Sequence, residues 1–188
     1  MDFNLIGLIR AAVLNGTPLL FGTSGEILTE KSGNMNLGVE GLMFMGGAFG
    51  LCGAFVYGRI AGDSAVGAVA VIIALLASFA AGVIGSLIFS FLTITLRANQ
   101  NVTGLAITTF GVGCGNFFGG SLIKIIKSDV PYLALVDIAR AFKTTLPFAE
   151  NTGDIGKLFF SYGFMVYLAI IIAIISAVFL KKTKHGLN

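Results

Sequence analysis

The chain has 188 residues, of which 56% are hydrophobic and 11% are charged, and its formal net charge is +3. A soluble domain carries about 25% charged residues, so this composition excludes an ordinary soluble protein and indicates an integral membrane protein. No basic run is interleaved with exposed aromatic residues, which argues against nucleic acid as a partner. We therefore expect an all-α, polytopic helical bundle in a lipid bilayer.

Five apolar segments approach the length of about 20 residues that a membrane-spanning helix needs. The first, 5–28, is the weakest, because Arg10 and Pro18 interrupt it. The third, 65–96, has no charged residue, and 161–180 ends at a lysine cluster. We predict a single transmembrane domain over 1–188 with spans at 5–28, 37–57, 65–96, 101–120 and 161–180 and an external segment at 121–160.

A polar stretch lies between the first and second predicted spans. Asn36 is a good helix N-cap, and a helix that begins there places Glu40 one turn along on the same face, near the positive end of the helix dipole. Gly38 and Gly41 flank Glu40 and leave room beside it. Asn34, Asn36 and Glu40 are therefore predicted to line a polar passage or a broken-helix hinge. An ordinary cytoplasmic loop with a helix cap explains the same residues equally well.

Small residues recur every four positions through the third predicted span. Such a ridge lets a second helix pack at close range. Gly46-x3-Gly50 and Gly111-x3-Gly115-x3-Gly119 follow the same spacing. A single motif of this kind recurs by chance in a chain with 26 glycines, so more weight falls on the longer ridge. The ridge consists of Ala70, Ala74, Ser78, Gly82, Ser86 and Ser90.

A second polar stretch precedes the fourth predicted span. Residues 99–101 are three consecutive carboxamides, and Thr103 follows them at the start of the span. The carboxamides could cap one helix and bond across to the first polar stretch. Thr108 and Thr109, inside the span, are expected to bond back to their own helix.

Basic residues in short loops predict the sidedness of the spans. The lysine cluster after the last span and Arg97 after the third place these ends in the cytoplasm. The chain's start and the turn at 59–63 then lie outside, and the turn at 30–31 lies inside. The segment 121–160 returns outside although it holds basic residues, because long loops follow this rule poorly. An amphipathic helix is predicted there around 132–142.

The sequence shows no catalytic constellation. The single histidine, His185, lies near the end of the sequence, and no nucleophile–base pair or metal-ligand spacing is visible. The glycines of the fourth span do not form a strand-to-helix phosphate cradle. Cys52 and Cys114 lie in apolar runs and are interpreted as small apolar packing residues. We therefore expect no catalytic residue, metal or cofactor in this chain, which argues against an intramembrane enzyme.

Two motifs resemble permease subunits of bacterial nucleoside and simple-sugar ABC importers, within the group that includes ribose-type and branched-chain amino acid permeases. The stretch Asn15–Gly50 carries the first, and Leu96–Gly113 resembles the pattern Leu-Arg-Ala-Asn-Gln that opens a span in that family. The tail Lys181–Asn188 looks like the start of the cytoplasmic loop that docks on the ATPase. The family's N-terminal pattern is matched here by Thr17-Pro18-Leu19-Leu20, Gly25-Glu26, Ser32-Gly33 and Asn36–Gly41.

The resemblance implies a transport subunit rather than an enzyme. Its expected partners are a second permease subunit, ABC ATPase subunits that bind ATP, and an extracytoplasmic substrate-binding lipoprotein. The expected location is the bacterial cytoplasmic (inner) membrane, with several spans. Such permeases are commonly longer, so the chain looks like the N-terminal part of a larger protein. The tail residues expected on the ATPase-docking side are His185, Gly186, Leu187 and Asn188.

The resemblance favours nucleosides as substrates, with simple sugars next, moved by alternating access. Neutral, hydroxyl-rich substrates need amide and hydroxyl partners rather than full charges. A branched-chain amino acid permease and an ATP-independent small-solute channel are the alternatives. The residues expected along the substrate pathway are Asn34, Asn36, Glu40, Asn99, Asn101 and Thr103.

Overall fold

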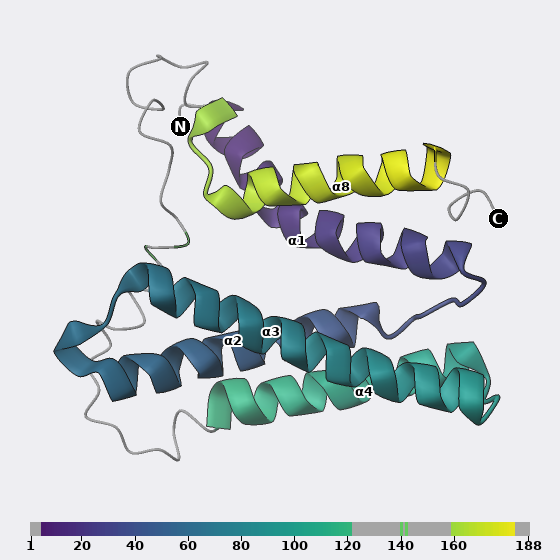
Figure 1. Cartoon of the computed structure of the whole chain (residues 1–188). Helices are drawn as coiled ribbons and strands as arrows, with labels where there is room; N and C mark the ends of the chain where they lie inside the picture. Colours follow the sequence, from purple (N-terminus) through teal and green to yellow (C-terminus); the bar gives the residue numbers. More distant parts are fainter. Residues whose placement is uncertain (1–4, 122–139, 141, 143–158, 183–188) are drawn as a thin grey trace. The chain divides into compact units, whose positions relative to one another are not determined.

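A computed structural model describes residues 5–121, 140, 142 and 159–182. The described residues form helices joined by short loops, with no strand among them, which confirms the all-α class. Five of these helices are long and apolar enough to cross a membrane. In chain order the elements are α1 (Leu5–Lys31), α2 (Val39–Ala61), η1 (Gly62–Ser64), α3 (Gly67–Ser90), η2 (Phe91–Thr95), α4 (Gln100–Asn116), η3 (Phe117–Ser121) and α8 (Phe164–Lys182) (Figure 1).

The observed helices overlap the predicted spans and differ from them at the ends. α1 continues to Lys31 and α2 to Ala61, because the polar residues at these ends still complete regular turns. α3 continues into η2, a π-helical turn, so that the long third span covers Gly67–Thr95. The predicted external segment 121–160, with its amphipathic helix, lies almost wholly outside the described residues. Membrane sidedness stays a prediction.

The chain divides into two compact units, Met1–Ser32 with Phe142–Asn188 and Gly33–Ala141. In the first unit α1 packs against α8, and Figure 1 shows both helices starting on the same side. Arg10 donates a hydrogen bond from Nη2 to the carbonyl of Ser161 at 3.4 Å, just before α8. This contact ties the start of α1 to the start of α8.

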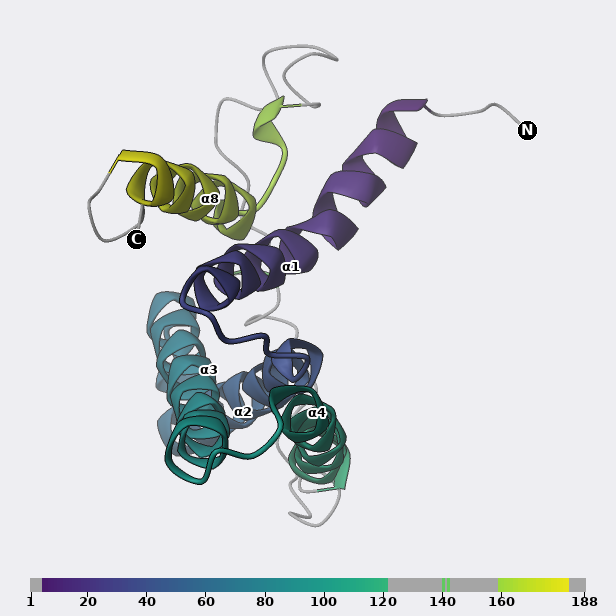
Figure 2. The same ribbon diagram turned by 90° about the vertical axis from the view of Figure 1, so that its right-hand side faces the viewer.

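The second unit is a three-helix group in which α2 lies between α3 and α4 (Figures 1 and 2). α2 meets α3 through the motif Gly46-x3-Gly50. The hydroxyl of Ser78 donates to the carbonyl of Gly46 at 2.8 Å. A methyl group on Gly50 would lie 3.0 Å from the carbonyl oxygen of Ala74. This motif therefore packs, although the sequence alone assigned it little weight.

α2 meets α4 at still closer range. A methyl group on Gly111 would lie 2.9 Å from the Cα of Gly41, and one on Gly41 would lie 2.8 Å from the carbonyl oxygen of Ile107. The same motif continues at Gly119, where the methyl would lie 3.3 Å from the Cβ of Ala48. Only glycine permits this approach of two helix backbones, because any Cβ would overlap the partner's main chain.

The small-residue ridge of α3 packs over its first half and not over its second. Ala70 and Ala74 are buried, whereas Ser86 is exposed. Four residues turn an α-helix by about 400°, so each step of the ridge moves about 40° around the axis. By its second half the ridge has left the α2 interface, where Gly85 now lies against Leu42. Among the described residues, the predicted ridge is therefore confirmed as a packing surface for its first half only.

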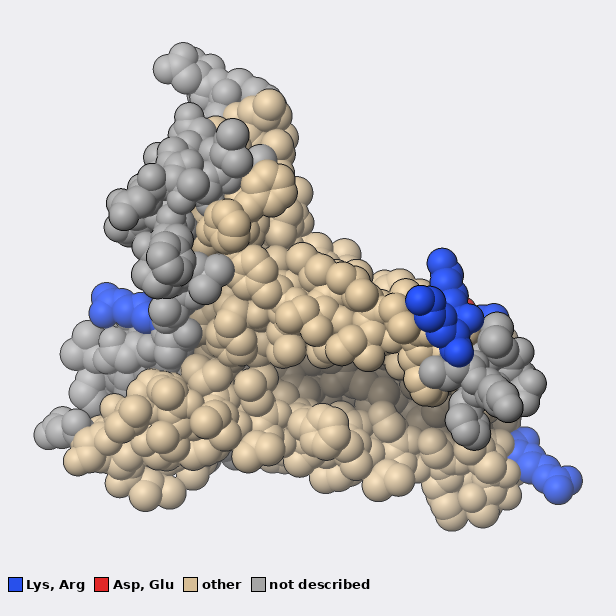
Figure 3. Space-filling view, turned by 45° about the horizontal axis from the view of Figure 1, so that its top comes forward, with Lys and Arg blue, Asp and Glu red and all other residues tan. Residues whose placement is uncertain are grey.

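Large apolar side chains cover much of the described surface. Leu19 is 69% exposed, Phe79 71% and Leu76 63%. On the face shown in Figure 3, nearly all of the described surface is uncharged, and Lys and Arg lie at its margins. Such a surface would be unfavourable in water, but it suits a lipid solvent.

Replacing Gly111 by alanine tests the close contact between α2 and α4. The added methyl would overlap the backbone of Gly41, so Gly111→Ala is expected to reduce the free energy of unfolding by about 1–3 kcal/mol. Gly113→Ala is the matched control on the same helix, because a methyl there meets no atom within 4 Å. Thermal unfolding in detergent measures both. Equal stability of the two variants would contradict the packing described here.

Candidate functional site

A polar junction forms where the loop 33–38 meets the N-terminal end of α4. Gln100 connects the two parts. Its Nε2 donates to Oδ1 of Asn34 at 3.1 Å, and its Oε1 accepts from the backbone N–H of Met35 at 3.0 Å. One side chain therefore holds both a side chain and the main chain of the loop. We use the name polar junction for Asn34, Asn36, Asn99, Gln100, Thr103 and Thr108.

Asn99 is the N-cap of α4. Its backbone is extended, and its Oδ1 accepts hydrogen bonds from the N–H groups of Asn101 at 3.0 Å and Val102 at 3.2 Å. These bonds satisfy two donors that the first turn of a helix leaves without a partner. The prediction that the consecutive carboxamides cap one helix and bond across to the other polar stretch is confirmed.

Asn36 does not cap α2, contrary to the prediction. Its Oδ1 accepts from the N–H of Gly38 at 2.8 Å, which is an Asx turn, and the N-cap of α2 is Gly38, without a side-chain cap. The helix starts later because the loop first lies against α4. The hydroxyl of Thr108 donates to the carbonyl of Leu37 at 2.8 Å, and a methyl on Gly104 would lie 2.8 Å from the nitrogen of Leu37.

The space expected beside Glu40 is filled. Gly38 and Gly41 are buried, and a methyl on Gly38 would lie 2.9 Å from Cγ2 of Ile107 on α4. The two glycines thus admit a neighbouring helix and not a substrate. Glu40 itself is exposed in the first turn of α2, where its carboxylate lies near the positive end of the helix dipole.

The predicted pathway residues fall into two groups by exposure. Asn36 and Thr103 are buried, at 8% and 7% exposed, and Asn34 is half-buried. Asn99, Asn101 and Glu40 are exposed. No hydrogen bond within the described ranges joins Glu40 to the polar junction. His185, Gly186, Leu187 and Asn188, expected on the ATPase-docking side, lie outside the described residues.

Two residues of the polar junction were not among the predicted pathway residues. Gln100 lies between the predicted pathway residues Asn99 and Asn101. The run of three consecutive carboxamides was the sequence signal that could have identified it. Thr108 was expected only to bond back to its own helix. Its hydroxyl lies 3.2 Å from the carbonyl of Gly104 but closer, 2.8 Å, to that of Leu37. Thr109 does bond back as expected, to Leu105 at 3.1 Å.

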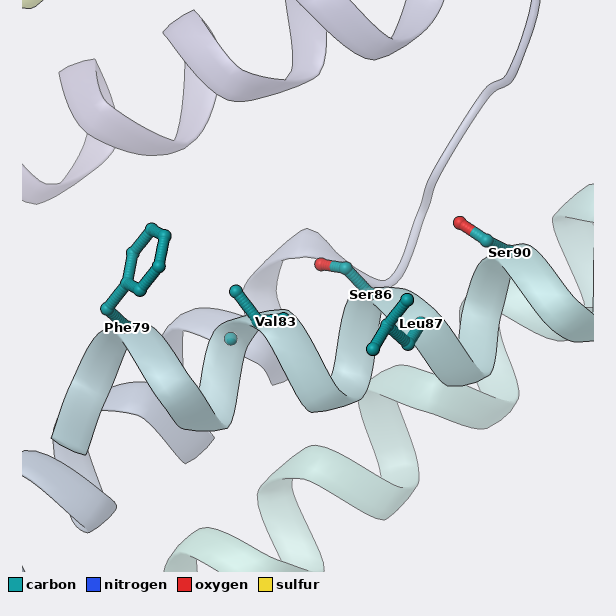
Figure 4. A pocket seen from close by; sticks show the side chains of 6 residues that line it. Phe79, Val83, Ser86, Leu87 and Ser90 are labelled. Carbon is teal, nitrogen blue, oxygen red and sulfur yellow. The ribbon is translucent and has the colours of Figure 1, made fainter. Parts of the chain in front are cut away.

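A groove on α3 is lined mainly by apolar side chains, unlike the polar junction. It has a volume of about 360 Å³, and only its two serines are polar. Figure 4 shows the side chains of Ser86 and Ser90 on this side of α3. The lining residues are Phe79, Gly82, Val83, Ser86, Leu87 and Ser90. Amide side chains gather instead at the polar junction.

Gln100→Ala tests whether this side chain holds the loop. The variant loses both hydrogen bonds and leaves Asn34 without this partner, so the free energy of unfolding should fall by about 1–3 kcal/mol. Gln100→Glu retains the acceptor for Met35 and loses the donor, and an intermediate loss is expected. Asn101→Ala is the neighbouring control, because that side chain is exposed. If Gln100→Ala unfolds at the same temperature as Asn101→Ala in detergent, the two bonds do not contribute.

Three relatives are similar to the chain over nearly its whole length. The guanosine ABC transporter permease protein NupQ of Bacillus subtilis is 32% identical over 96% of this chain and 54% of its own. TsgC13 of Haloferax volcanii, named provisionally as a glucose ABC transporter permease protein, is 30% identical over 97% of this chain and 50% of its own. The nucleoside ABC transporter permease protein NupC of Lactococcus lactis subsp. cremoris is 26% identical over 98% of this chain and 56% of its own.

The chain thus spans about half the length of the curated relatives it matches. No solved structure matches it. Residues 8–188 match the protein family described as the permease component of branched-chain amino acid transport systems. With its five long apolar helices and this match over nearly all of its residues, the chain belongs to that family of membrane permeases.

Proposed function

We propose that this chain is the N-terminal part of the transmembrane domain of a permease subunit that admits nucleosides to the cell in an ATP-driven ABC importer. The family match over residues 8–188 carries the proposal. The mechanism is alternating access, in which rigid groups of helices rock so that one side of the membrane closes as the other opens.

The proposed assembly combines this chain with three kinds of protein partner in a lipid bilayer. A second permease subunit completes the pathway, ABC ATPase subunits bind the cytoplasmic face and hydrolyse ATP, and an extracytoplasmic lipoprotein delivers substrate. The membrane is the bacterial cytoplasmic (inner) membrane. The chain itself needs no cofactor in this scheme, because nucleotide binds the partner ATPase.

Nucleosides are the proposed substrate class because two of the three similar proteins carry nucleoside names. The exposed amide of Asn101 is compatible with a neutral, hydroxyl-rich solute, since an amide both donates and accepts hydrogen bonds. Glu40 and Asn101 are the groups placed to meet such a solute, because their side chains are exposed and take no part in the hydrogen bonds of the polar junction. Simple sugars are the second class, in line with the glucose name of TsgC13.

Uptake of radiolabelled guanosine tests the proposal. The complete transporter is reconstituted in proteoliposomes with its ATPase, and the binding protein and guanosine are added outside. Uptake should require ATP in the lumen, because only molecules whose ATPase faces the lumen import guanosine. An ATPase variant that binds ATP without hydrolysing it should abolish uptake. Excess unlabelled nucleoside should compete, whereas leucine should not. Guanosine entry that is independent of ATP would favour a channel, and competition by leucine would favour a branched-chain amino acid permease.

Glu40→Gln and Asn101→Ala test the pathway assignment. Each is expected to lower uptake several-fold at unchanged stability, because each removes an exposed polar group from the proposed wall and leaves the bonds of Gln100 and Asn99 in place. Thr109→Val is the control on α4, since that hydroxyl bonds only to its own helix. Wild-type uptake by both variants, at wild-type abundance, removes these residues from the pathway.

A further inference from the structure

The chain passes from one compact unit to the other between Ser32 and Gly33. It crosses again between 141 and 142, beside residues outside the described ranges. At the first crossing the structure shows which backbone groups are held and which are not. Hydrogen bonds on the two sides of the crossing decide where the chain can turn.

Hydrogen bonds to the last turn of α1 hold the chain before the crossing as far as Ser32. The N–H of Ser32 donates to the carbonyl of Thr29 at 3.1 Å and to that of Leu28 at 3.3 Å. The hydroxyl of Ser32 donates to the carbonyl of Thr29 at 2.6 Å. Ser32 therefore moves with α1.

The loop after the crossing is held from Asn34 onward. Gln100 bonds both Asn34 and the N–H of Met35, and Thr108 bonds the carbonyl of Leu37. These four consecutive positions, 34–37, are therefore attached to α4, directly or through the Asx turn of Asn36. They move with the second unit.

Gly33 is the one residue between these two held segments. Its φ is +84°, which L side chains rarely adopt, and a methyl added there would meet no atom within 4 Å. It is exposed, and it makes no hydrogen bond to a described residue. Gly33 therefore lies in the turn that follows α1 with no hydrogen bond of its own to a described residue and with open space around it.

Gly62 provides the contrast. It is the other glycine in the described ranges with positive φ, at +53°, and a methyl added there would likewise meet open space. Its N–H, however, donates to the carbonyl of Gly58, and its own carbonyl accepts from Ala65 at 3.2 Å. Gly62 is thus held in its turn by its own backbone hydrogen bonds, whereas Gly33 has none to a described residue.

We propose that Gly33 is the hinge about which the α1–α8 unit turns relative to the α2–α4 unit, with Gln100 fixing the far side of the joint. The inference deepens the proposed function, because alternating access needs rigid groups joined by a few residues that absorb the change in φ and ψ. It also gives a role to the hydrogen bonds that hold the loop immediately after Gly33. They restrict the change in backbone angles to this one residue.

Spin-label distances in the complete transporter test the hinge. In a background with Cys52 and Cys114 replaced, one pair of labels is placed at Leu19 and Ile60, across the joint, and a second at Ile60 and Val102, within the second unit. All three positions are exposed. Distances are measured in nucleotide-free and ATP-bound states. The pair across the joint should shift between the states, and the pair within the unit should not.

Gly33→Ala should reduce that shift, and Gly62→Ala, its match in positive φ and open space, should retain it. A shift that survives Gly33→Ala, or that both variants lose, overturns the hinge. So does an unchanged distance across the joint in the unmutated background, which requires no folding of a glycine variant. The readout is a distance and not transport, so a wrong substrate assignment would show as absent guanosine uptake with the shift preserved.

Discussion

Close contact between the backbones of α2 and α4 is the constraint on which the second unit depends. Gly41 and Gly111 meet with no side chain between them. In lipid, apolar side chains gain little by leaving acyl chains for one another, so van der Waals contact between backbones and bonds such as that from Ser78 to Gly46 hold helices together. The same approach brings the loop before α2 onto the start of α4, and the polar junction follows from it.

The polar residues of the polar junction and those beside it in the sequence differ in their bonding. The side chains of Asn36, Asn99 and Gln100 form hydrogen bonds with backbone and side-chain groups where the loop before α2 meets the start of α4. A polar group left without a hydrogen bond there would be costly away from water. Glu40 and Asn101 have exposed side chains outside those bonds. Most side chains of this polar stretch thus have a structural role, and in the proposed function contact with a solute falls to its exposed members.

If Gly33 is the hinge proposed above, the hydrogen-bonded loop beside it has a consequence for transport. Clamping residues 34–37 to α4 means that force applied to the second unit reaches the joint without first deforming the loop. In the proposed hinge, motion of α1 with α8 would be concentrated at Gly33 and would not spread over several residues. Such concentration favours two discrete arrangements of rigid groups over continuous bending, which is what alternating access requires.

The sequence by itself determined that lipid is the solvent, that the chain is all-α, and that it holds about five spans. Long apolar runs can satisfy their backbone groups in lipid only as helices, so composition and run length suffice for these conclusions. It also located the two polar stretches and foresaw that the carboxamides at 99–101 would connect them. Only the tertiary structure decided which small-residue motifs pack, because an i, i+4 ridge winds away from a straight neighbour, as that of α3 does after Ser78. It likewise decided that Asn36 makes a turn and does not cap α2, because contact with α4 delays the start of the helix, and no local pattern encodes that contact.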